Sequence, residues 1–225
     1  MLVAGSQPAG RGPVAAGRGT KFWQHQMENN FKSTKYDIMF DRIEAGTYLI
    51  AAALTGKKIK ITGISTKILK KEISTLKKMG IKFNIKKNEI VVLNTKIVKP
   101  ISLKTEPYPG FPTDLQAQIM VLMNKANGTS KIKENIFEKR FMHVPELNRM
   151  GSKIKISGDT SFIYGPQQLN GAEVMATDLR ASVSLVLAGL DAQGKTTINR
   201  VYHLDRGYEN LEKKLRNCGA KITRV

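Results

Sequence analysis

Cysteine is almost absent from this sequence, and long apolar runs are absent altogether. Cys218 is the one cysteine among 225 residues, which excludes a disulfide within the chain and favours a cytoplasmic location. No segment approaches the roughly 18 consecutive apolar residues that a membrane-spanning helix requires. The opening residues are rich in Gly, Ala, Pro and Arg where a secretory signal has an apolar stretch. We therefore expect no membrane partner.

Acidic residues are scarce relative to basic ones. Lys and Arg number 37 against 18 Asp and Glu, and the formal net charge is +19. Such an excess favours anionic partners, either nucleic acid or phosphorylated metabolites. It is equally compatible with a lysine-rich proteome, and the lysine-dense residues 67–88 lack the interleaved aromatics of a single-strand binder. Nucleic-acid binding is therefore the least favoured of the functions considered.

Common cofactor and metal motifs are missing as well. The sequence has no GxGxxG, Walker-type loop, HExxH or GxSxG. His143 and His203 have no Cys or carboxylate at metal-ligand spacing. We expect neither a metal ion nor an organic cofactor.

What the chain does contain is a threefold internal repeat. LKKMGIKF, LNRMGSKI and LRNCGAKI share one pattern, with glycines at positions 80, 151 and 219 that are 71 and 68 residues apart. IEAGTY, LQAQ and LRAS share a second, whose first residues, at 43, 115 and 179, are 72 and 64 apart. Two patterns with a similar spacing indicate three copies of one unit. In the third copy Cys218 stands where the others have Met79 and Met150, so we expect it to be a core side chain.

Each unit predicts the same order of elements. A helix that is apolar or small on nearly every face comes first, at residues 45–56, 115–128 and 179–194, and each ends near a glycine. Such helices are typically buried on all sides. A strand follows, at residues 58–64, 130–137 and 196–202. An amphipathic helix comes next, clearest at 66–80 and 208–219, and strands close the unit, as in residues 81–94 with a hairpin turn at Lys87–Asn88.

The buried helices predict a functional end of the molecule. If they pack as equivalent units, their N-termini face one end, where three positive dipole termini combine with the side chains located there. Those side chains are Glu44, Asp114, Asp178 and Arg180. The sequence therefore predicts an α/β fold whose interior helices present one shared rim suited to an anionic ligand.

Asp114 is the main candidate for chemistry at this rim. A carboxylate there can accept the proton of a substrate hydroxyl that is positioned against it. The alternative, common for any acid in a first helical turn, is a stabilising interaction with the helix dipole. Asp178 occupies the matching place in the third unit, where this alternative has more weight. Thr113 and Gln116 also fit a capping box at the start of the second interior helix.

Three arginines lie near equivalent ends of the repeat. Arg140 lies between Phe137 and Phe141 in the sequence. Arg180 lies in the first turn of the third interior helix, and Arg206 precedes the last helix. The helix dipole opposes a cation at Arg180, so an acidic or anionic partner should compensate. A single Arg is commonly just an ion-pair partner. Together with the helix N-termini, however, the three arginines suit a clamp for phosphate and carboxylate groups.

Five segments resemble the enolpyruvyl transferase family, and within it the UDP-N-acetylglucosamine 1-carboxyvinyltransferases: DRIEAGTY, YPGFPTDLQAQ, FEKRFMHVPELNRMG, AEVMATDLRASVSLVLAGL and YHLDRGYENLEKKL. The resemblance runs from about Tyr36 to the C-terminus, and it implies an inside-out α/β barrel. It also implies transfer of the enolpyruvyl group of phosphoenolpyruvate to the 3-hydroxyl of UDP-N-acetylglucosamine in peptidoglycan synthesis. The reaction it implies is an addition followed by an elimination, without a metal or organic cofactor.

The same resemblance assigns roles to individual residues. Asp114 is implied to be the base that contacts the sugar hydroxyl, and Ile136 to contact the UDP-sugar. The remaining residues are implied to line the cleft for the phosphate and carboxylate of phosphoenolpyruvate and for loop closure, or to support it: Arg140, Arg180 and Arg206 as ligands, Asp178 and Glu44 as supporting acids.

The resemblance covers only the C-terminal one of the family's two domains. We expect residues 1–35 to be a flexible or foreign segment. Residues 36–225 are then the C-terminal domain, in units of about 36–97, 98–165 and 166–225. The family's catalytic cysteine loop and most nucleotide contacts belong to the other domain, so we expect half a site and negligible turnover by this chain alone. The alternatives are a non-catalytic anion-binding protein or a half-protein that a separate N-terminal half complements.

Overall fold

The computed structural model describes residue 35, residues 37–93 and residues 97–225. Residues 39–225 form one compact unit. The prediction of a flexible or foreign segment over residues 1–35 lies outside the described residues, apart from Lys35. None of the helices in the described part of the chain has the length and apolar character that crossing a bilayer requires.

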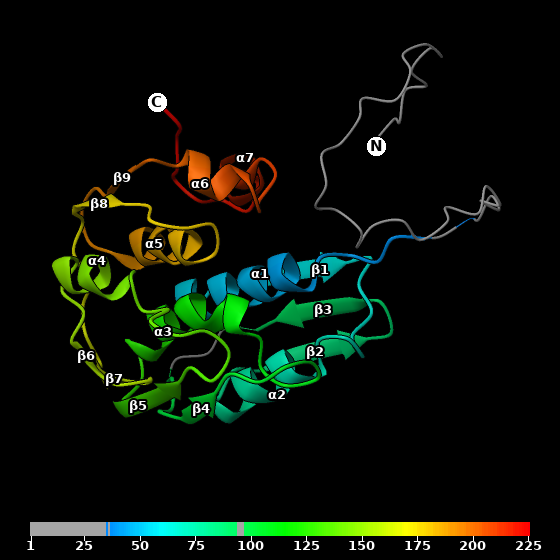
Figure 1. Ribbon diagram of the computed structural model, residues 1–225. Helices are drawn as coiled ribbons and strands as arrows, with labels where there is room; N and C mark the ends of the chain where they lie inside the picture. The colour runs from blue at the N-terminus through cyan, green and yellow to red at the C-terminus, as the bar shows by residue number, and fades with distance from the viewer. Residues whose placement is uncertain (1–34, 36, 94–96) are drawn as a thin grey trace, which may run out of the picture. The chain divides into compact units, whose positions relative to one another are not determined.

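Three helices lie at the centre of the compact unit. α1 (Arg42–Thr55), α3 (Gln116–Met123) and α5 (Ala181–Asp191) pack against one another (Figure 1). Every residue of α3 is buried, as are residues 181–188 of α5. Because apolar or small side chains occur on all faces of these helices, interior packing removes the most apolar surface from water. The prediction of buried interior helices is confirmed.

The three helices point the same way, as their C-terminal ends show. The Lys125 ammonium group, just after α3, donates to the carbonyl of Leu54 in α1 over 3.1 Å and forms an ion pair with Asp191 at the end of α5. Three C-termini therefore meet at one cation, which their carbonyl-rich ends attract. The three N-termini consequently share the opposite end.

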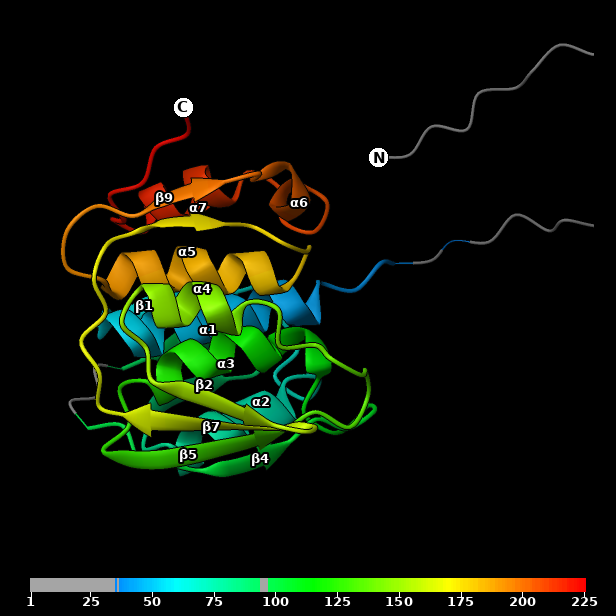
Figure 2. The same ribbon diagram turned by 60° about the vertical axis from the view of Figure 1, so that its left-hand side comes forward.

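Around the helices, the described residues form three separate sheets (Figure 2). The first has the antiparallel order β1 (Ile59–Thr62), β3 (Glu89–Val92), β2 (Phe83–Lys86), with its hairpin turn at Lys87–Asn88 as expected. The second has the order β4 (Ser102–Lys104), β5 (Gly128–Lys133), β7 (Thr160–Gly165), β6 (Ile154–Ser157), and its β4–β5 pair is parallel. The third is the parallel pair β8 (Glu173–Met175) and β9 (Thr197–Asn199). The fold is α/β, with helices inside and sheets outside.

Short helices follow the strands and end at the repeated glycines. α2 (Lys70–Lys78), α4 (Val144–Arg149) and α7 (Leu211–Asn217) follow the strands, and the single turn α6 (Tyr202–Asp205) precedes α7. The repeated glycines after α2, α4 and α7 are Gly80, Gly151 and Gly219, with φ of 92°, 97° and 90°. Residues with a Cβ are strained in this left-handed region, so each unit uses glycine where its helix ends.

The predicted segment ends where the helix ends for α1, and it runs past the end of the helix for α3 and α5. Gly56 caps α1 in a left-handed conformation with φ of 64°. α3 and α5 stop several residues before their glycines, because the chain after each helix pairs with another segment. Gln167 N donates to Asn124 O over 2.8 Å, and Gln193 N donates to Leu169 O over 2.9 Å. These tertiary hydrogen bonds carry no local sequence signal.

The expectation that Cys218 is a core side chain is wrong. Met79 and Met150 are fully buried, whereas Cys218 is exposed. In the first two units a hairpin follows this position, β2–β3 or β6–β7, and belongs to the sheet of that unit. Residues 220–225, which follow Cys218, form no strand. The position is therefore buried in the two units where a hairpin follows it and exposed in the third.

Candidate functional site

The N-termini of the three interior helices bring charged side chains together. Asp41 is the N-cap of α1, Asp114 lies in η1 (Thr113–Leu115) before α3, and Arg180 directly precedes α5. Arg180 Nε lies 3.6 Å from Asp114 Oδ2, and Arg180 Nη2 lies 3.8 Å from Asp41 Oδ2. The acidic partners expected for a cation at a helix N-terminus are therefore present.

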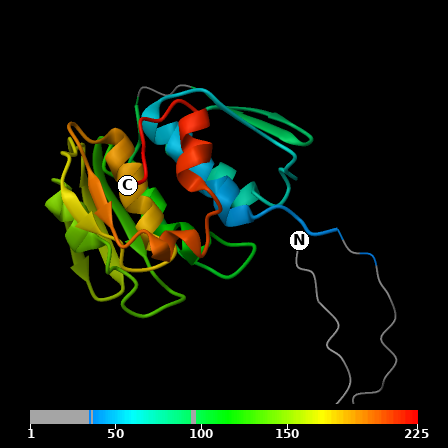
Figure 3. The same cartoon turned by 90° about the horizontal axis from the view of Figure 1, so that it is seen from above.

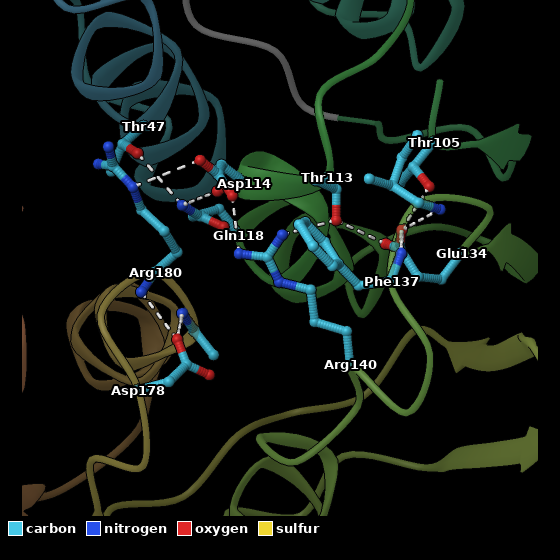
Figure 4. A network of polar contacts seen from close by, with 12 residues as sticks. Thr47, Thr105, Thr113, Asp114, Gln118, Glu134, Phe137, Arg140, Asp178 and Arg180 are labelled. Atoms are coloured by element: carbon cyan, nitrogen blue, oxygen red, sulfur yellow. Dashed lines mark hydrogen bonds and ion pairs between the residues drawn. The ribbon is translucent and has the colours of Figure 1, made fainter. Parts of the chain in front are cut away.

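Arg140 approaches Asp114 from the other side (Figure 4). Its Nη2 donates to Asp114 Oδ1 over 2.7 Å, and its Nη1 donates to Thr113 Oγ1 over 2.8 Å. Its guanidinium carbon lies 5.0 Å from the centre of the Phe137 ring. The Asp114 side chain is 35% exposed, so a ligand can reach it although an arginine contacts each of its oxygens.

A buried carboxylate lies behind this pair. Glu134 is 4% exposed and accepts hydrogen bonds from the Thr113 hydroxyl on Oε2 over 2.9 Å and from the Thr105 hydroxyl on Oε1 over 2.8 Å. Oε1 also accepts from the backbone N–H groups of residues 136 and 137. The capping box predicted for the start of α3 is wrong, because the Thr113 hydroxyl is directed to Glu134. Among the described residues no side chain caps η1 or α3.

A neutral polar cluster lies beneath Arg180. The Arg180 guanidinium carbon is 5.4 Å from the centre of the Tyr208 ring. The Tyr208 hydroxyl lies 2.9 Å from Thr47 Oγ1 and accepts from Gln118 Nε2 over 3.3 Å. Burial raises the pKa of Tyr208 above its ordinary value, so its hydroxyl is protonated at neutral pH. This cluster joins α1, α3 and the segment before α7.

Asp178 stabilises the start of α5. Its Oδ1 accepts from the backbone N–H groups of Arg180 and Ala181 over 2.8 and 2.7 Å. These contacts satisfy two of the donors that a helix N-terminus leaves without partners. Asp178 therefore makes the contacts of the alternative role expected for an acid in a first helical turn, which is to stabilise the helix.

Glu44 and Arg206 are not brought to Asp114. Glu44 Oε1 accepts from Lys214 Nζ over 2.7 Å, and α7, which carries Lys214, lies beside α1 (Figure 3). Arg206 is exposed, and its side chain has no hydrogen bond or ion pair within the described part of the chain. Their roles as supporting acid and substrate ligand stay predictions.

Ile136 lines a pocket of about 460 Å³ formed by the segment after β5. Glu134 and Phe137 line it from the same segment, and Asp159 lines it from the turn between β6 and β7. The pocket therefore adjoins the segment that carries Arg140. The role of Ile136 as a sugar contact stays a prediction.

Within residues 35, 37–93 and 97–225, no group of three His, Cys, Asp or Glu side chains is arranged to hold a metal ion.

His143 is a buried titratable residue next to this segment. It is 1% exposed, its Nε2 lies 3.4 Å from Met120 Sδ, and its Nδ1 has no partner among the described residues. Burial lowers the pKa of His143 to about 4, with Asp178 opposing the shift and Arg140 adding to it. His143 is therefore neutral at pH 7.

Lowering the pH from 7 to 4 should destabilise the protein through His143. Between the ordinary His pKa of 6.5 and about 4, the unfolded chain binds a proton at this residue that the folded chain does not. The contribution of His143 to stability is therefore complete above pH 6.5 and falls by up to about 3 kcal/mol toward pH 4. Urea unfolding at several pH values should show a smaller loss for His143→Phe than for the wild type.

Met142→Phe changes an exposed neighbour of His143 that has no titratable group, and this control should keep the wild-type pH dependence. A His143→Phe profile parallel to that of the wild type would contradict the assignment.

Sequence reasoning missed several residues of this site. Asp41 had a local signal, since an Asp followed three residues later by Glu44 is a capping pattern before an apolar run. Glu134, Thr105 and Tyr208 had none. They reach the site only because the segments after β4 and β5 and the segment before α7 converge on η1 and α5.

Comparison with known proteins identifies a family. The sequence model described as EPSP synthase (3-phosphoshikimate 1-carboxyvinyltransferase) matches residues 14–215. The chain is 64% identical over 197 residues to the UDP-N-acetylglucosamine 1-carboxyvinyltransferase of Pelagibacter ubique (strain HTCC1062), covering 88% of this chain and 47% of that protein. It is 50% identical over 215 residues to the protein of the same name from Brucella ovis, covering 95% of this chain and 50% of that protein.

Solved structures agree on the fold. The enolpyruvyl transferase NikO from Streptomyces tendae matches with a TM-score of 0.77 and 31% identity, over 83% of this chain and 44% of that one. EPSP synthase from Acinetobacter baumannii matches with a TM-score of 0.62 and 18% identity, over 85% of this chain and 45% of that one. The chain spans about half the length of the curated relatives it matches. On the match over residues 14–215 and the identity to these relatives, this chain belongs to the EPSP synthase family of enolpyruvyl transferases.

Proposed function

We propose that this chain contributes part of the active site of an enolpyruvyl transferase of peptidoglycan synthesis. The substrates are phosphoenolpyruvate and UDP-N-acetylglucosamine, whose 3-hydroxyl receives the enolpyruvyl group. The observation that carries the proposal is Asp114, a partly exposed carboxylate with an arginine at each oxygen. It occurs in a chain 64% identical to the Pelagibacter ubique protein named for this transfer.

Asp114 acts as the base. It accepts the proton of the 3-hydroxyl as the hydroxyl oxygen bonds to carbon 2 of phosphoenolpyruvate, while carbon 3 takes a proton from an acid. The adduct then loses phosphate from carbon 2 and a proton from carbon 3, which restores the double bond. By resemblance, the acid belongs to the domain that this chain does not match.

Arg140 and Arg180 bind the anionic groups of the substrates. Both guanidinium groups contact Asp114 in the described structure. A phosphate or carboxylate group competes for the same N–H donors and forms stronger, bidentate contacts with arginine. Substrate binding would therefore draw the guanidinium groups away from Asp114 and leave its oxygens available to the sugar hydroxyl. Arg206 supplies a third cation, Ile136 contacts the UDP-sugar, and Asp178 holds the start of α5.

The finer architecture and location belong to the same proposal. The three interior helices and three outer sheets are assigned to an inside-out α/β barrel, with units of about 36–97, 98–165 and 166–225. A second domain, which a separate N-terminal half could supply, completes the site. The location assigned to the protein is cytoplasmic.

Mixing experiments test the proposal. The chain should bind UDP-N-acetylglucosamine in a calorimetric titration and should release no phosphate from phosphoenolpyruvate by itself. Adding the N-terminal half of the Pelagibacter ubique relative should produce phosphate release that depends on both substrates. Absence of both sugar-nucleotide binding and restored turnover would overturn the function, and strong turnover by the chain alone would overturn the half-site assignment.

A further inference from the structure

We infer that Glu134 is a positioning residue for Arg140 and that it acts on both supports of the Arg140 guanidinium group. One support is the Thr113 hydroxyl to which Arg140 donates, and the other is the Phe137 ring over which it lies. Figure 4 shows Thr113 between Arg140 and Glu134, with a hydrogen bond to each. The meaning of this arrangement for substrate binding rests on the proposed function, but the arrangement itself does not.

The first support depends on the direction of one proton. A carboxylate can only accept a hydrogen bond, so the Thr113 hydroxyl donates to Glu134 Oε2 over 2.9 Å. Its oxygen lone pairs are then free to accept from Arg140 Nη1 at 2.8 Å, since a guanidinium group can only donate. Glu134 therefore makes the Thr113 oxygen an acceptor for Arg140 Nη1. With Nη1 held at Thr113, Nη2 is directed at Asp114.

The second support depends on the backbone after β5. Glu134 Oε1 accepts from the N–H groups of Ile136 and Phe137 over 2.9 and 3.2 Å. The Phe137 side chain is 56% exposed, so burial does not hold it in place. Holding its backbone N–H is what places the ring 5.0 Å from the Arg140 guanidinium carbon. The Thr105 hydroxyl, which also donates to Oε1 over 2.8 Å, orients the carboxylate.

Glu134→Gln disturbs this arrangement with almost no change in volume. With its NH₂ toward Thr113, the amide donates to the hydroxyl, whose proton must then turn away and can point at the Arg140 donor. With its NH₂ toward residues 136 and 137, the amide faces two N–H donors and the Thr105 hydroxyl. The first orientation takes away the acceptor of the Thr113 hydroxyl proton, whose partners are Glu134 and Arg140, and the second sets donors face to face; both are costly in a buried site.

Nitrogen NMR of the chain labelled with ¹⁵N-arginine measures the order of Arg140 directly. Hydrogen bonds at both Nη atoms slow rotation of the guanidinium group, so the wild type should show separate Nη signals, assigned through Arg140→Lys. Glu134→Gln and Thr113→Val should merge these signals toward the behaviour of the exposed Arg206. Thr113→Ser keeps the hydroxyl and should keep the separate signals.

Ser152→Ala is the matched control, because it removes a different buried hydroxyl, one bound to Asn124, and should leave the Arg140 signals unchanged. Unchanged Arg140 signals in folded Glu134→Gln would overturn the inference. If Glu134→Gln fails to fold, unchanged Arg140 signals in Thr113→Val would overturn the inference.

A binding arm separates this inference from the proposed function. Loss of an ordered charge-assisted contact should weaken UDP-N-acetylglucosamine binding at least about tenfold in Glu134→Gln and Thr113→Val. Thr113→Ser and Ser152→Ala should bind like the wild type. Merged Arg140 signals, together with a wild-type chain that neither binds the sugar nucleotide nor gains turnover with the N-terminal half, would support the positioning role and overturn the function. Merged signals with undiminished binding would overturn the role of Glu134 in the site.

Discussion

Asp114→Asn should lower the rate of enolpyruvyl transfer by about 10²–10⁴-fold, the range typical for loss of a general base. Asparagine keeps the volume of the side chain, but it cannot take the proton of the 3-hydroxyl. Because proton transfer occurs in the transition state, kcat should fall while the KM for UDP-N-acetylglucosamine changes little. The measurement is phosphate release by the chain mixed with the N-terminal half of the Pelagibacter ubique relative.

Glu89→Gln provides the comparison for this variant. Glu89 is an acid of β3 whose side chain pairs with Lys60 at 3.6 Å, and its loss should leave the rate unchanged. An Asp114→Asn protein that kept more than about a tenth of the wild-type rate would show that Asp114 is not the base.

Gly165→Ala should cost about 3 kcal/mol of folding stability or more, the upper range for overpacking a core. Gly165 ends β7 against the last carbonyl groups of α3. A Cβ at this position would lie 2.9 Å from Asn124 O and 3.0 Å from Met123 O, and closer still to Ala126 O. These are backbone atoms, so relief requires α3 itself to shift. Urea unfolding curves measure the loss.

Gly158→Ala is the control, because it introduces backbone strain without a steric clash. Gly158 has φ of 58°, and a Cβ there meets nothing within 4 Å. Its substitution should therefore cost only about 1–2 kcal/mol, the strain of a left-handed residue. Similar losses in the two variants would contradict the close approach of β7 to α3. A shift of α3 should also reduce activity, since η1 and Asp114 directly precede this helix.

The fold was largely predictable because its signals are local and repeated. Helices apolar on all faces can be stable only in an interior, and the sequence has three of them at similar spacing. The glycines at 80, 151 and 219 mark the same left-handed helix end in each unit. The ends of α3 and α5 were misjudged because hydrogen bonds to residues 167–169 stop these helices before their glycines.

The site was predictable only in part. Asp114 and Arg180 could be placed on one rim, since both lie at the start of interior helices that point the same way. Glu44 lies at such a start as well, yet its side chain pairs with Lys214 of α7. A residue in the first turn of a helix is known to lie at the N-terminal end of that helix. Its place in the turn does not determine which side chain of another element it contacts.

The amino-acid sequence by itself determined the three repeated units, the burial of their first helices and the residue types gathered at one end. Only the tertiary structure decided which of these residues touch. It placed Arg140 and Arg180 on opposite oxygens of Asp114, and it placed Glu134 behind Thr113. The reason is physical: periodicity and helix propensity act over a few residues, whereas these contacts join segments up to 66 positions apart and depend on how whole helices and strands pack.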